Sequence, residues 1–378
     1  MPDEKLTAYR GGKALRRGWT TGSCAAAASQ AAAVLLLTGI APPEIHLHTP
    51  GGITFCLPVE DAHMSGNTAV CTVRKDAGDD PDITNGVRIT ASVRRIEKGV
   101  TIEGGAGVGR ITRPGLAMPV GEAAINPGPR QQITDAVHRA AEQNGYGGGF
   151  SVTISVEDGE ALAAQTYNGH LGIVGGISIL GTSGIVEPMS EKALVDTIRL
   201  ELDSLYAQGQ RIAFLCPGNY GADFARDTLG LDLERAVKCS NFIGEAFDHA
   251  AYRGYPEILL VGHAGKLVKM AAGVMNTHSS VADARQEIFT AHAALCGAPH
   301  ETLEGLMAAI SVDACVELLD EVNLRQPVLS RIGREMENRI ALRMKGQARV
   351  EFIMFTGKYG VLAESAGARA LCERLKLQ

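Results

Sequence analysis

One pattern occurs in RIAFLCPGNYGADFARD (residues 211–227) and again in EILLVGHAGKLVKMAAGV (residues 257–274). A short run of apolar residues is followed by a glycine-containing loop and then by a helical segment. The same order is found in AVKCS (236–240) with the helix from Asn241, and in GGISIL (175–180) with the helix after it. Successive strand–loop–helix units predict a parallel sheet with helices on both faces.

The N-terminal part follows a different pattern. Hydroxyl residues in Thr20-Thr21-Gly22-Ser23 predict the cap of a helix that ends at Gly39. Segment 44–97 contains short β-branched runs separated by turn sequences such as DAGDDPD, which is typical of strands. A helix over 130–143 follows, and then a hairpin with its turn at Asp158-Gly159.

These patterns predict an α/β protein, and more specifically a multi-domain α+β one. Because 378 residues exceed the usual size of one hydrophobic core, we expect two domains. We expect an α+β domain over 1–170 and an α/β domain over 171–378, with the boundary near 168–175. The second domain is expected to contain a helical region over 281–345 and two late strands near 349–364. The sequence leaves open which sheet these strands join.

Composition argues against several functional classes. With 45% hydrophobic and 21% charged residues, the chain has the composition of a folded globular protein. Its net charge of −6 argues against nucleic acid or an anionic membrane as the main partner. The eight cysteines form no C-x-x-C pair, which argues against a zinc framework or a thioredoxin-like site and suits a reducing cytoplasm.

The apolar run AAAASQAAAVLLLTG at 25–39 needs a separate interpretation. It is too short for a membrane span, and Ser29 and Gln30 interrupt it. It also lacks the small-residue cleavage site of a secretion signal. We therefore interpret it as a buried helix.

Loops after the expected strands are candidate binding sites, because ligands of open parallel sheets bind outside the carboxyl ends of the strands. That edge is expected to present the loops 181–184, 217–219, 240–241 and 263–266. Their backbone N–H groups and the adjoining helix dipoles favour a carboxylate. Ser, Asn and Gly before helices are also ordinary caps, and this alternative stays open for each loop.

Histidines are candidates for proton transfer and metal ligation. His263 and His278 lie near the expected working edge and suit either task, with a capping or core role as the alternative. His46 and His48 alternate on an expected strand. Two ligands without a third make a poor metal site, so we interpret this pair as surface histidines.

Six long strings follow one another along the chain. They are GWTTGSCAAAA (18–28), RPGLAMPVGEAAINPGPRQQI (113–133), GGISILGTSGIVEPMSEKAL (175–194), PGNYGADFARD (217–227), KCSNFIGEAFDHA (238–250) and LLVGHAGKLVKMAAGVMNTHS (259–279). In their amino-acid sequence and in their order along the chain, they closely resemble the cobalt-precorrin-5B C1-methyltransferase family over nearly the whole chain.

The resemblance implies a cytoplasmic enzyme that moves a methyl group from S-adenosylmethionine to C1 of cobalt-precorrin-5B, giving cobalt-precorrin-6A. Cobalt then enters only as part of the substrate, and no metal site of the protein's own is expected. The resemblance also implies that one domain is similar to ribosomal protein S5 domain 2. The expected partner is the corrinoid substrate. A homo-oligomer, and hand-over to neighbouring pathway enzymes, are left open.

Strand-end placement and the resemblance together give a hypothesis for the site. The candidate general bases are His263, Asp223 and His278. The candidate substrate- and donor-binding residues are Thr20, Thr21, Gly22, Ser23, Gly181, Thr182, Ser183, Gly218, Asn219, Asn241 and Lys266. Of these, Thr182, Ser183, Asn219 and Lys266 are expected to bind carboxylates, and residues 20–23 to close the cleft from the first domain. The alternative functions are a corrinoid-binding carrier and an ATP-dependent phosphotransferase.

Overall fold

The computed structural model describes residues 6–377, which form two compact units. Unit 1 ends at Glu191 and unit 2 begins at Lys192. The boundary therefore falls later than the expected one near 168–175. The reason is that three very short strands between residues 173 and 186 pair with strands of unit 1.

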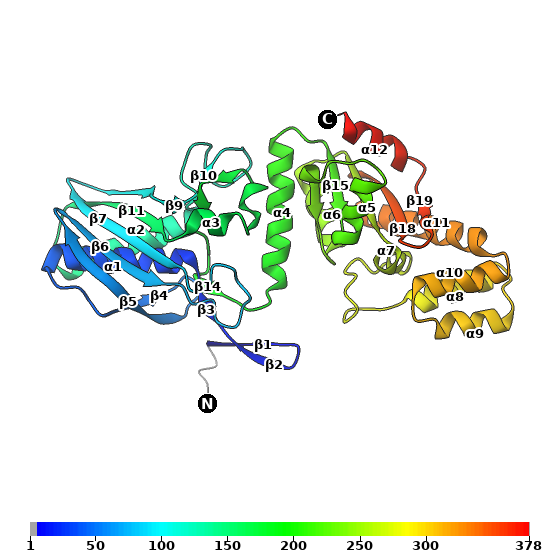
Figure 1. Cartoon of the computed structure of the whole chain (residues 1–378), viewed down its shortest axis with the longest axis horizontal. Coiled ribbons are helices and arrows are strands. Elements are labelled where there is room, and N and C mark those ends of the chain that lie inside the picture. The colour runs from blue at the N-terminus through cyan, green and yellow to red at the C-terminus, as the bar shows by residue number, and fades with distance from the viewer. Residues whose placement is uncertain (1–5, 378) are drawn as a thin grey trace. The chain divides into compact units, whose positions relative to one another are not determined.

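Unit 1 contains most of the antiparallel structure (Figure 1). Its elements are β1 (Thr7–Arg10), β2 (Lys13–Arg16), β3 (Gly18–Trp19), α1 (Thr21–Thr38), β4 (Glu44–His48), β5 (Thr54–Ser65), β6 (Thr68–Arg74), β7 (Arg88–Ile96), β8 (Val100–Gly104), β9 (Gly107–Val108), β10 (Arg110–Ile111), α2 (Pro127–Gln143), β11 (Gly149–Val156), α3 (Gly159–Ala163), the 3-10 helix η2 (Tyr167–Gly169), β12 (Ile173–Val174), β13 (Gly176–Ile177) and β14 (Ile185–Val186).

The main sheet of unit 1 has the strand order β4-β5-β6-β7-β11-β8. All neighbours are antiparallel except β11 and β8. Apolar residues alternate along the strands, and their buried face forms one core with α1 and α2. The opposite face carries the exposed residues, as in β4, where Ile45 and Leu47 are buried and the residues between them are not.

Helix α1 is the central core element of unit 1. Thr20 caps it by accepting the Ser23 N–H, and Gly39 ends it in the left-handed conformation at φ 75°. Its alanines are almost wholly inaccessible, because small side chains let α1 pack closely against the sheet and α2. By length and composition α1 alone among the described helices could span a membrane, yet 78% of it is buried inside the structure. The interpretation as a buried core helix is confirmed.

Two expectations about unit 1 are wrong. Asp158-Gly159 is not a hairpin turn: Asp158 adopts φ 53° and leads into α3, and β11 instead pairs with β7 and β8. GGISIL does not open the parallel sheet either, since only Gly176–Ile177 is a strand and it pairs with β9. The loop 181–184 therefore belongs to unit 1 and not to the edge of the parallel sheet.

Strands and helices alternate in unit 2 as far as β17, and a run of helices then precedes β18 (Figure 1). Its elements are α4 (Glu191–Ala207), β15 (Ile212–Cys216), α5 (Asn219–Asp227), η3 (Leu233–Arg235), β16 (Ala236–Lys238), α6 (Ile243–Arg253), β17 (Glu257–His263), α7 (Ala264–Leu267), η4 (Val268–Ala272), α8 (Arg285–Leu295), α9 (His300–Ala308), α10 (Val312–Glu321), α11 (Arg325–Met344), β18 (Arg349–Thr356), β19 (Gly360–Glu364) and α12 (Ala368–Lys376).

The sheet of unit 2 has the order β16-β15-β17-β18-β19, parallel except for β19. The late strands join this sheet, and the segment before them is helical. Ile212, Phe214 and Cys216 of β15 pack with α5 and α12 on one face. Ala213 and Leu215 pack with α4, α6 and α11 on the other. Helices therefore cover both faces of the sheet.

The strand order creates a switch point between β15 and β17. The chain passes from β15 through α5 to β16 on one side, and then crosses to β17 on the other side of β15. The segments that follow these two neighbouring strands pack into different cores: α5 into one, and α7 with η4 into the other. In doubly wound folds such a divergence forms a crevice outside the carboxyl ends of the two strands, and ligands bind there.

Candidate functional site

The first turn of α1 is joined to the loop 178–184. The Gly22 N–H donates to the Leu180 carbonyl oxygen at 3.0 Å. The Ser23 hydroxyl donates to the Gly184 carbonyl oxygen at 2.8 Å. Two groups of predicted binding residues, one on α1 and one in this loop, therefore come together within unit 1.

Glycine is needed where these segments meet. A Cβ on Gly22 would lie 2.8 Å from Cγ of Pro129, and one on Gly181 would lie 2.3 Å from Oγ1 of Thr20. Gly181 also has a φ of 120°, which residues with a side chain rarely adopt. These two glycines serve the close approach of the backbones. Thr182 and Ser183, beside them, are exposed.

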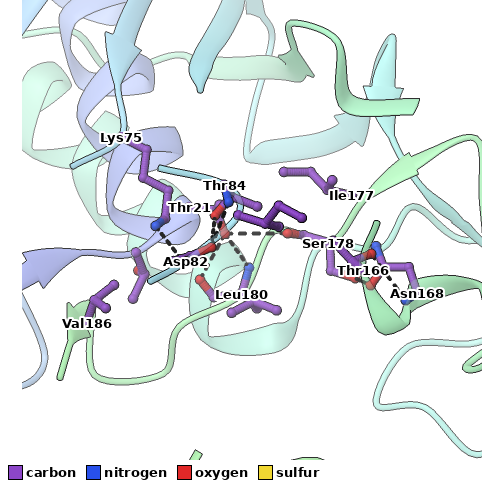
Figure 2. Close-up of a pocket in the computed structure, with 12 residues that line it drawn as sticks. Thr21, Lys75, Asp82, Thr84, Thr166, Asn168, Ile177, Ser178, Leu180 and Val186 are labelled. Carbon is purple, nitrogen blue, oxygen red and sulfur yellow. Dashed lines mark hydrogen bonds and ion pairs between the residues drawn. The ribbon is translucent and has the colours of Figure 1, made fainter. Parts of the chain in front are cut away.

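A cavity of about 200 Å³ lies beside this junction (Figure 2). Pockets that enclose a whole drug-sized ligand have roughly 300–1,000 Å³, so this one suits a single functional group of a larger ligand. Its polar lining comes from the start of α1, from the turn before β7 and from the segment around η2 and β13: Thr20, Thr21, Lys75, Asp82, Thr84, Thr166, Asn168 and Ser178.

An ion pair forms one wall of the cavity. The Lys75 ammonium donates to Asp82 at 2.6 Å, and the Lys75 side chain is only 2% exposed. Asp82 also accepts the N–H and the hydroxyl of Thr84, each at 2.7 Å. Burial by itself raises the pKa of Asp82, but the charge and hydrogen bond of Lys75 and the Thr84 bonds outweigh it, so the pKa lies below its usual value.

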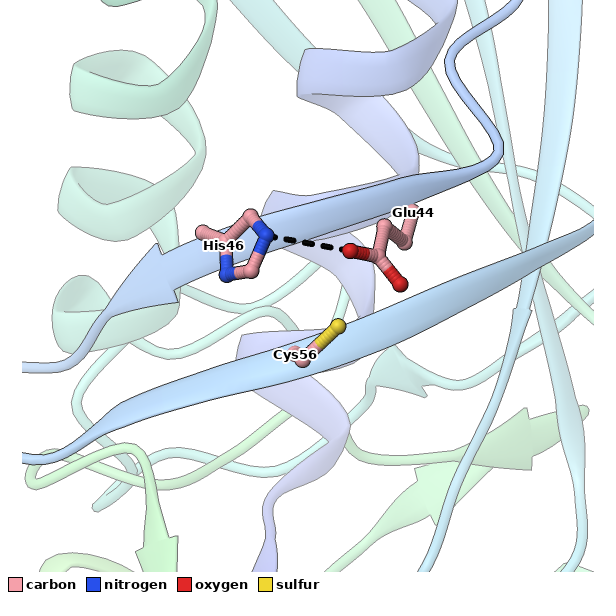
Figure 3. A group of neighbouring side chains, drawn as sticks. All are labelled: Glu44, His46 and Cys56. Carbon is pink, nitrogen blue, oxygen red and sulfur yellow. Dashed lines mark ion pairs between the residues drawn. The ribbon is translucent and has the colours of Figure 1, made fainter.

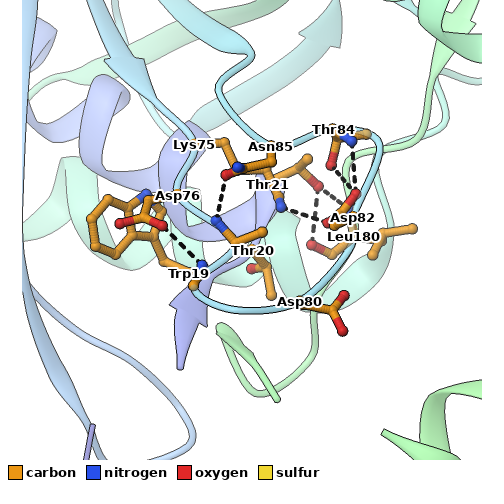
Figure 4. A network of polar contacts seen from close by, with 12 residues as sticks. Trp19, Thr20, Thr21, Lys75, Asp76, Asp80, Asp82, Thr84, Asn85 and Leu180 are labelled. Carbon is orange, nitrogen blue, oxygen red and sulfur yellow. Dashed lines mark hydrogen bonds and ion pairs between the residues drawn. The ribbon is translucent and has the colours of Figure 1, made fainter. Parts of the chain in front are cut away.

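The turn that carries this pair is held against the start of α1 (Figure 4). The backbone N–H of Trp19 donates to the Asp76 carbonyl oxygen at 2.9 Å, and the side-chain oxygen of Asn85 accepts the Ala77 N–H at 2.9 Å. Lys75 gives one of its three N–H groups to Asp82, and the 18-residue helix α1 directs its positive end at the same place. The remaining N–H groups of the Lys75 ammonium are the donors that this wall offers to an oxygen of a ligand.

In unit 2 the predicted residues gather at the carboxyl ends of the strands. Gly218 and Asn219 follow β15, and Lys266 lies on α7 directly after β17, so both sides of the switch point carry predicted residues. A Cβ on Gly218 would lie 3.5 Å from the Lys266 Nζ, which places the ammonium next to this loop. The Asn219 side chain accepts a hydrogen bond from Lys238 at 3.3 Å.

Lys266 is half-buried and forms no ion pair with any carboxylate of residues 6–377. Its ammonium donates to the Ser240 carbonyl oxygen at 3.4 Å. Ser240 itself adopts φ 52°, an uncommon conformation for a residue with a side chain. Burial lowers the pKa of Lys266. The carboxyl ends of β15 and β17 thus have next to them a positive charge for which the described residues provide no carboxylate partner.

His263 caps α7 through its side chain. The Gly265 N–H donates to Nδ1 at 3.1 Å, so the proton of the neutral ring lies on Nε2. The ring packs edge-on against Phe355 at 5.7 Å, and burial lowers the pKa of His263. The capping role that the sequence left open is therefore the observed one.

Three other predicted residues have local partners. Asp223 is exposed on α5 and pairs with Arg226 at 3.1 Å. His278 is exposed, and its Nδ1 lies 2.6 Å from the Ser280 hydroxyl. The Asn241 carbonyl oxygen accepts the Thr277 N–H at 2.9 Å, which anchors the segment before His278.

Sequence reasoning missed the ion pair of Lys75 and Asp82, and it also missed Glu201. Glu201 is half-buried on α4, next to the end of β16. Burial raises the pKa of Glu201 to about 7, although the N–H and the charge of Lys238 lower it in part. A lone lysine in an Asp-rich turn and a glutamate in an amphipathic helix both look solvated in the sequence, so no local signal distinguishes them.

Two family models and a solved structure are similar to this chain. The sequence model of the CbiD family matches residues 8–188, and that of the CbiD C-terminal domain matches residues 276–366. A crystal structure of the cobalamin biosynthesis protein CbiD from Archaeoglobus fulgidus is 31% identical, covers 75% of this chain and 88% of its own, and has a TM-score of 0.40.

Curated relatives extend the match over the whole chain. The cobalt-precorrin-5B C(1)-methyltransferase of Ruminiclostridium cellulolyticum is 50% identical over 347 residues, 92% of this chain and 90% of that protein. The protein of the same name from Citrobacter koseri is 40% identical over 100% of both chains. That from Alkaliphilus metalliredigens is 43% identical over 97% and 96%. Because the family models and these relatives agree along both units, the chain belongs to the CbiD family.

Proposed function

We propose that this chain is the S-adenosylmethionine-dependent methyltransferase that acts on C1 of cobalt-precorrin-5B in the anaerobic route to cobalamin. The observation that carries the proposal is the 50% identity to a relative of that name over 92% of the chain. The cytoplasmic setting, the likeness of unit 1 to ribosomal protein S5 domain 2, and any homo-oligomer or hand-over to neighbouring enzymes belong to the same proposal. All eight cysteines are free, which suits a reducing compartment.

The reaction places particular demands on the residues. The donor supplies an electrophilic sulfonium methyl group, the C1 carbon forms the new bond to it, and the bond from methyl to sulfur breaks. Catalysis then rests mainly on proximity and alignment, which contribute about 7–11 kcal/mol at best. The chain must therefore hold a polycarboxylate ring and a carboxylate-bearing donor in fixed positions, which requires groups that bind carboxylates.

The crevice of unit 2 supports binding of one such carboxylate. Lys266 carries a charge without a carboxylate partner in the described structure, and Asn219 and the N–H groups around Gly218 lie on the other side of the switch point. His263 donates through Nε2, because Nδ1 already accepts the Gly265 N–H. We assign it a hydrogen bond to the substrate and no proton abstraction.

The cavity of unit 1 is assigned a second carboxylate. Lys75 provides the donors, through the N–H groups that it does not give to Asp82. The volume of about 200 Å³ admits a single side-chain carboxylate of the ring or the amino-acid end of the donor. Thr182 and Ser183 keep their predicted binding role at the exposed side of this junction.

Proton transfer, where C1 chemistry requires it, is assigned to Glu201. Asp223 and His278 are exposed and already have local partners, whereas burial raises the pKa of Glu201 to about 7, where a carboxylate accepts and releases a proton easily. The pH profile of kcat tests the assignment. The wild-type rate should rise as the pH passes through 7, and the rate of Glu201→Gln should be low without that rise; an unchanged rise in the variant contradicts it.

The function itself is tested by incubating the chain with cobalt-precorrin-5B and S-adenosylmethionine, followed by mass spectrometry. The expected result is a product heavier by one methyl group, located at C1 by NMR. Tight ring binding without a mass gain would favour the carrier. A product that forms only with ATP and Mg²⁺ would favour the phosphotransferase, and either result rejects the proposal.

A further inference from the structure

Three potential metal ligands meet on the exposed face of the β4–β5 ladder (Figure 3). His46 and Cys56 are direct cross-strand neighbours, and Glu44 precedes His46 by two residues on the same face. The His46 Nε2 lies 3.1 Å from the Glu44 carboxylate, and the ligand atoms of the three residues all lie within 4.8 Å of one another. From the sequence only His46 and His48 were candidate ligands in this segment. The folded chain brings the Cys56 sulfur and the Glu44 carboxylate next to His46.

The core holds this face in place. The intervening residues, Ile45, Leu47, Phe55 and Leu57, are buried in the core of unit 1. A slip of the β4–β5 register by one residue would turn these apolar side chains to solvent, so the register is strongly specified. The register of the sheet therefore keeps the three polar side chains together on one face.

The donor set selects a class of cation. One imidazole nitrogen, one thiolate sulfur and one carboxylate oxygen suit zinc-class divalent ions, whereas magnesium and calcium prefer oxygen alone. Tetrahedral zinc with bonds of about 2.0–2.3 Å needs ligand atoms roughly 3.5 Å apart, which small side-chain rotations provide from the observed spacing. We propose that Glu44, His46 and Cys56 form a surface site for a zinc-class cation, with the fourth coordination position open.

Binding requires a balanced exchange of one proton. In the metal-free chain Cys56 is a free cysteine next to Glu44 and His46, and its sulfur carries the thiol proton. The cation takes the place of that thiol proton: the S–H bond breaks, the sulfur–metal bond forms, and the proton goes to solvent. The Glu44 carboxylate and the Cys56 thiolate each contribute one negative charge and His46 is neutral, so the site with Zn²⁺ has no net charge.

The test titrates the full chain with Zn²⁺ by calorimetry and with Co²⁺ by absorption spectroscopy. One equivalent of Zn²⁺ should bind, and Co²⁺ should give a near-ultraviolet thiolate-to-cobalt band. Cys56→Ser should remove the band, and both it and His46→Ala should weaken Zn²⁺ binding at least tenfold. His48→Ala is the matched control, because His48 lies on the same face but bonds to Thr54 at 3.0 Å.

Two results would overturn the site. Equal Zn²⁺ affinity of wild type and Cys56→Ser would show that the sulfur takes no part, and a loss in His48→Ala as large as in His46→Ala would show non-specific histidine binding. Cys296→Ser should keep the band, since Cys296 is the other cysteine that is not buried. His46, His48 and Cys56 are exposed, so substitutions at these three positions should leave the thermal midpoint unchanged. The test uses neither donor nor corrinoid, and its outcome is independent of the proposed enzyme activity.

Discussion

Unit 1 and unit 2 each have a lysine next to residues that the sequence predicts to bind a ligand, but the surroundings of the two lysines differ. In unit 1 Lys75 is 2% exposed and paired with Asp82 at 2.6 Å. In unit 2 Lys266 is half-buried, and its hydrogen bond goes to the Ser240 carbonyl oxygen and to no carboxylate of the described chain. The first charge is compensated inside the protein, and the second is not.

The difference separates two roles of a buried cation. Burial of a charge is costly unless a partner compensates it, so the pair in unit 1 is a structural requirement that also shapes a cavity. Lys266 opposes folding to a small extent and has its charge free for an anionic ligand. Substitutions in unit 1 should therefore act first on stability, and those at Lys266 first on binding.

The largest effect is expected for Asp82→Asn. The variant keeps the shape but leaves the Lys75 ammonium buried without its counter-charge, which costs about 3 kcal/mol of unfolding free energy. Urea unfolding followed by Trp19 fluorescence measures it, because this is the single tryptophan and it lies in unit 1. The double variant Lys75→Met/Asp82→Asn should recover most of the loss. A cost below about 1 kcal/mol for the single variant contradicts the structural role of the pair.

Gly181→Ala should cost somewhat less, about 2 kcal/mol, because the new methyl group meets Thr20 at 2.3 Å in a backbone conformation at φ 120°. Gly175→Ala is the control. It also has a positive φ, of 81°, but no atom lies within 4 Å of its added Cβ, so only the backbone strain of about 1 kcal/mol should appear. Trp19 fluorescence again reports the unfolding, and equal costs at both positions would disprove the close packing of the loop on α1.

The comparison also shows what the sequence can and cannot predict. The capping threonine, the alanine-rich run and Gly39 are local signals, and the helix they predict is observed from Thr21 to Thr38. The strand–loop–helix units after residue 211 were recognisable for the same reason: each contains a buried strand bounded by a loop. Local chemistry is enough where an element is long and regular.

The rest depends on contacts between distant segments. Strands β12, β13 and β14 have two residues each and no periodicity, so their pairing with β10, β9 and β3 could not be predicted. That pairing moved the loop with Gly181 from the expected sheet edge to the start of α1. Lys75 and Asp82 are seven residues apart in a turn-rich stretch, and only the folded chain shows that it buries them together.

Lys266→Met should lower kcat/KM at least tenfold, equivalent to about 1.4 kcal/mol of lost transition-state stabilisation, because the crevice loses its uncompensated charge. The thermal midpoint should stay the same or rise slightly, since no ion pair is broken. Methyl transfer to cobalt-precorrin-5B provides the rate. Lys358→Met is the control: Lys358 follows β18 of the same sheet but pairs with Glu317. If both variants keep wild-type rates, Lys266 has no part in binding.

The smallest and sharpest contrast is in the titration of these two lysines, measured by NMR after isotope-labelled reductive methylation. Burial lowers the pKa of Lys266, whereas the hydrogen bond to Glu317 raises the pKa of Lys358. A lysine whose folded pKa lies below its unfolded value of about 10.4 disfavours the folded state at lower pH. The unfolding free energy of unit 2 should therefore increase as the pH rises from the folded pKa of Lys266 towards its unfolded pKa. Lys266→Met should not show this increase. A carboxylate ligand next to Lys266 should raise the titration midpoint of Lys266 and leave that of Lys358 unchanged. Coincident titration midpoints of the two lysines in the free protein would contradict the comparison.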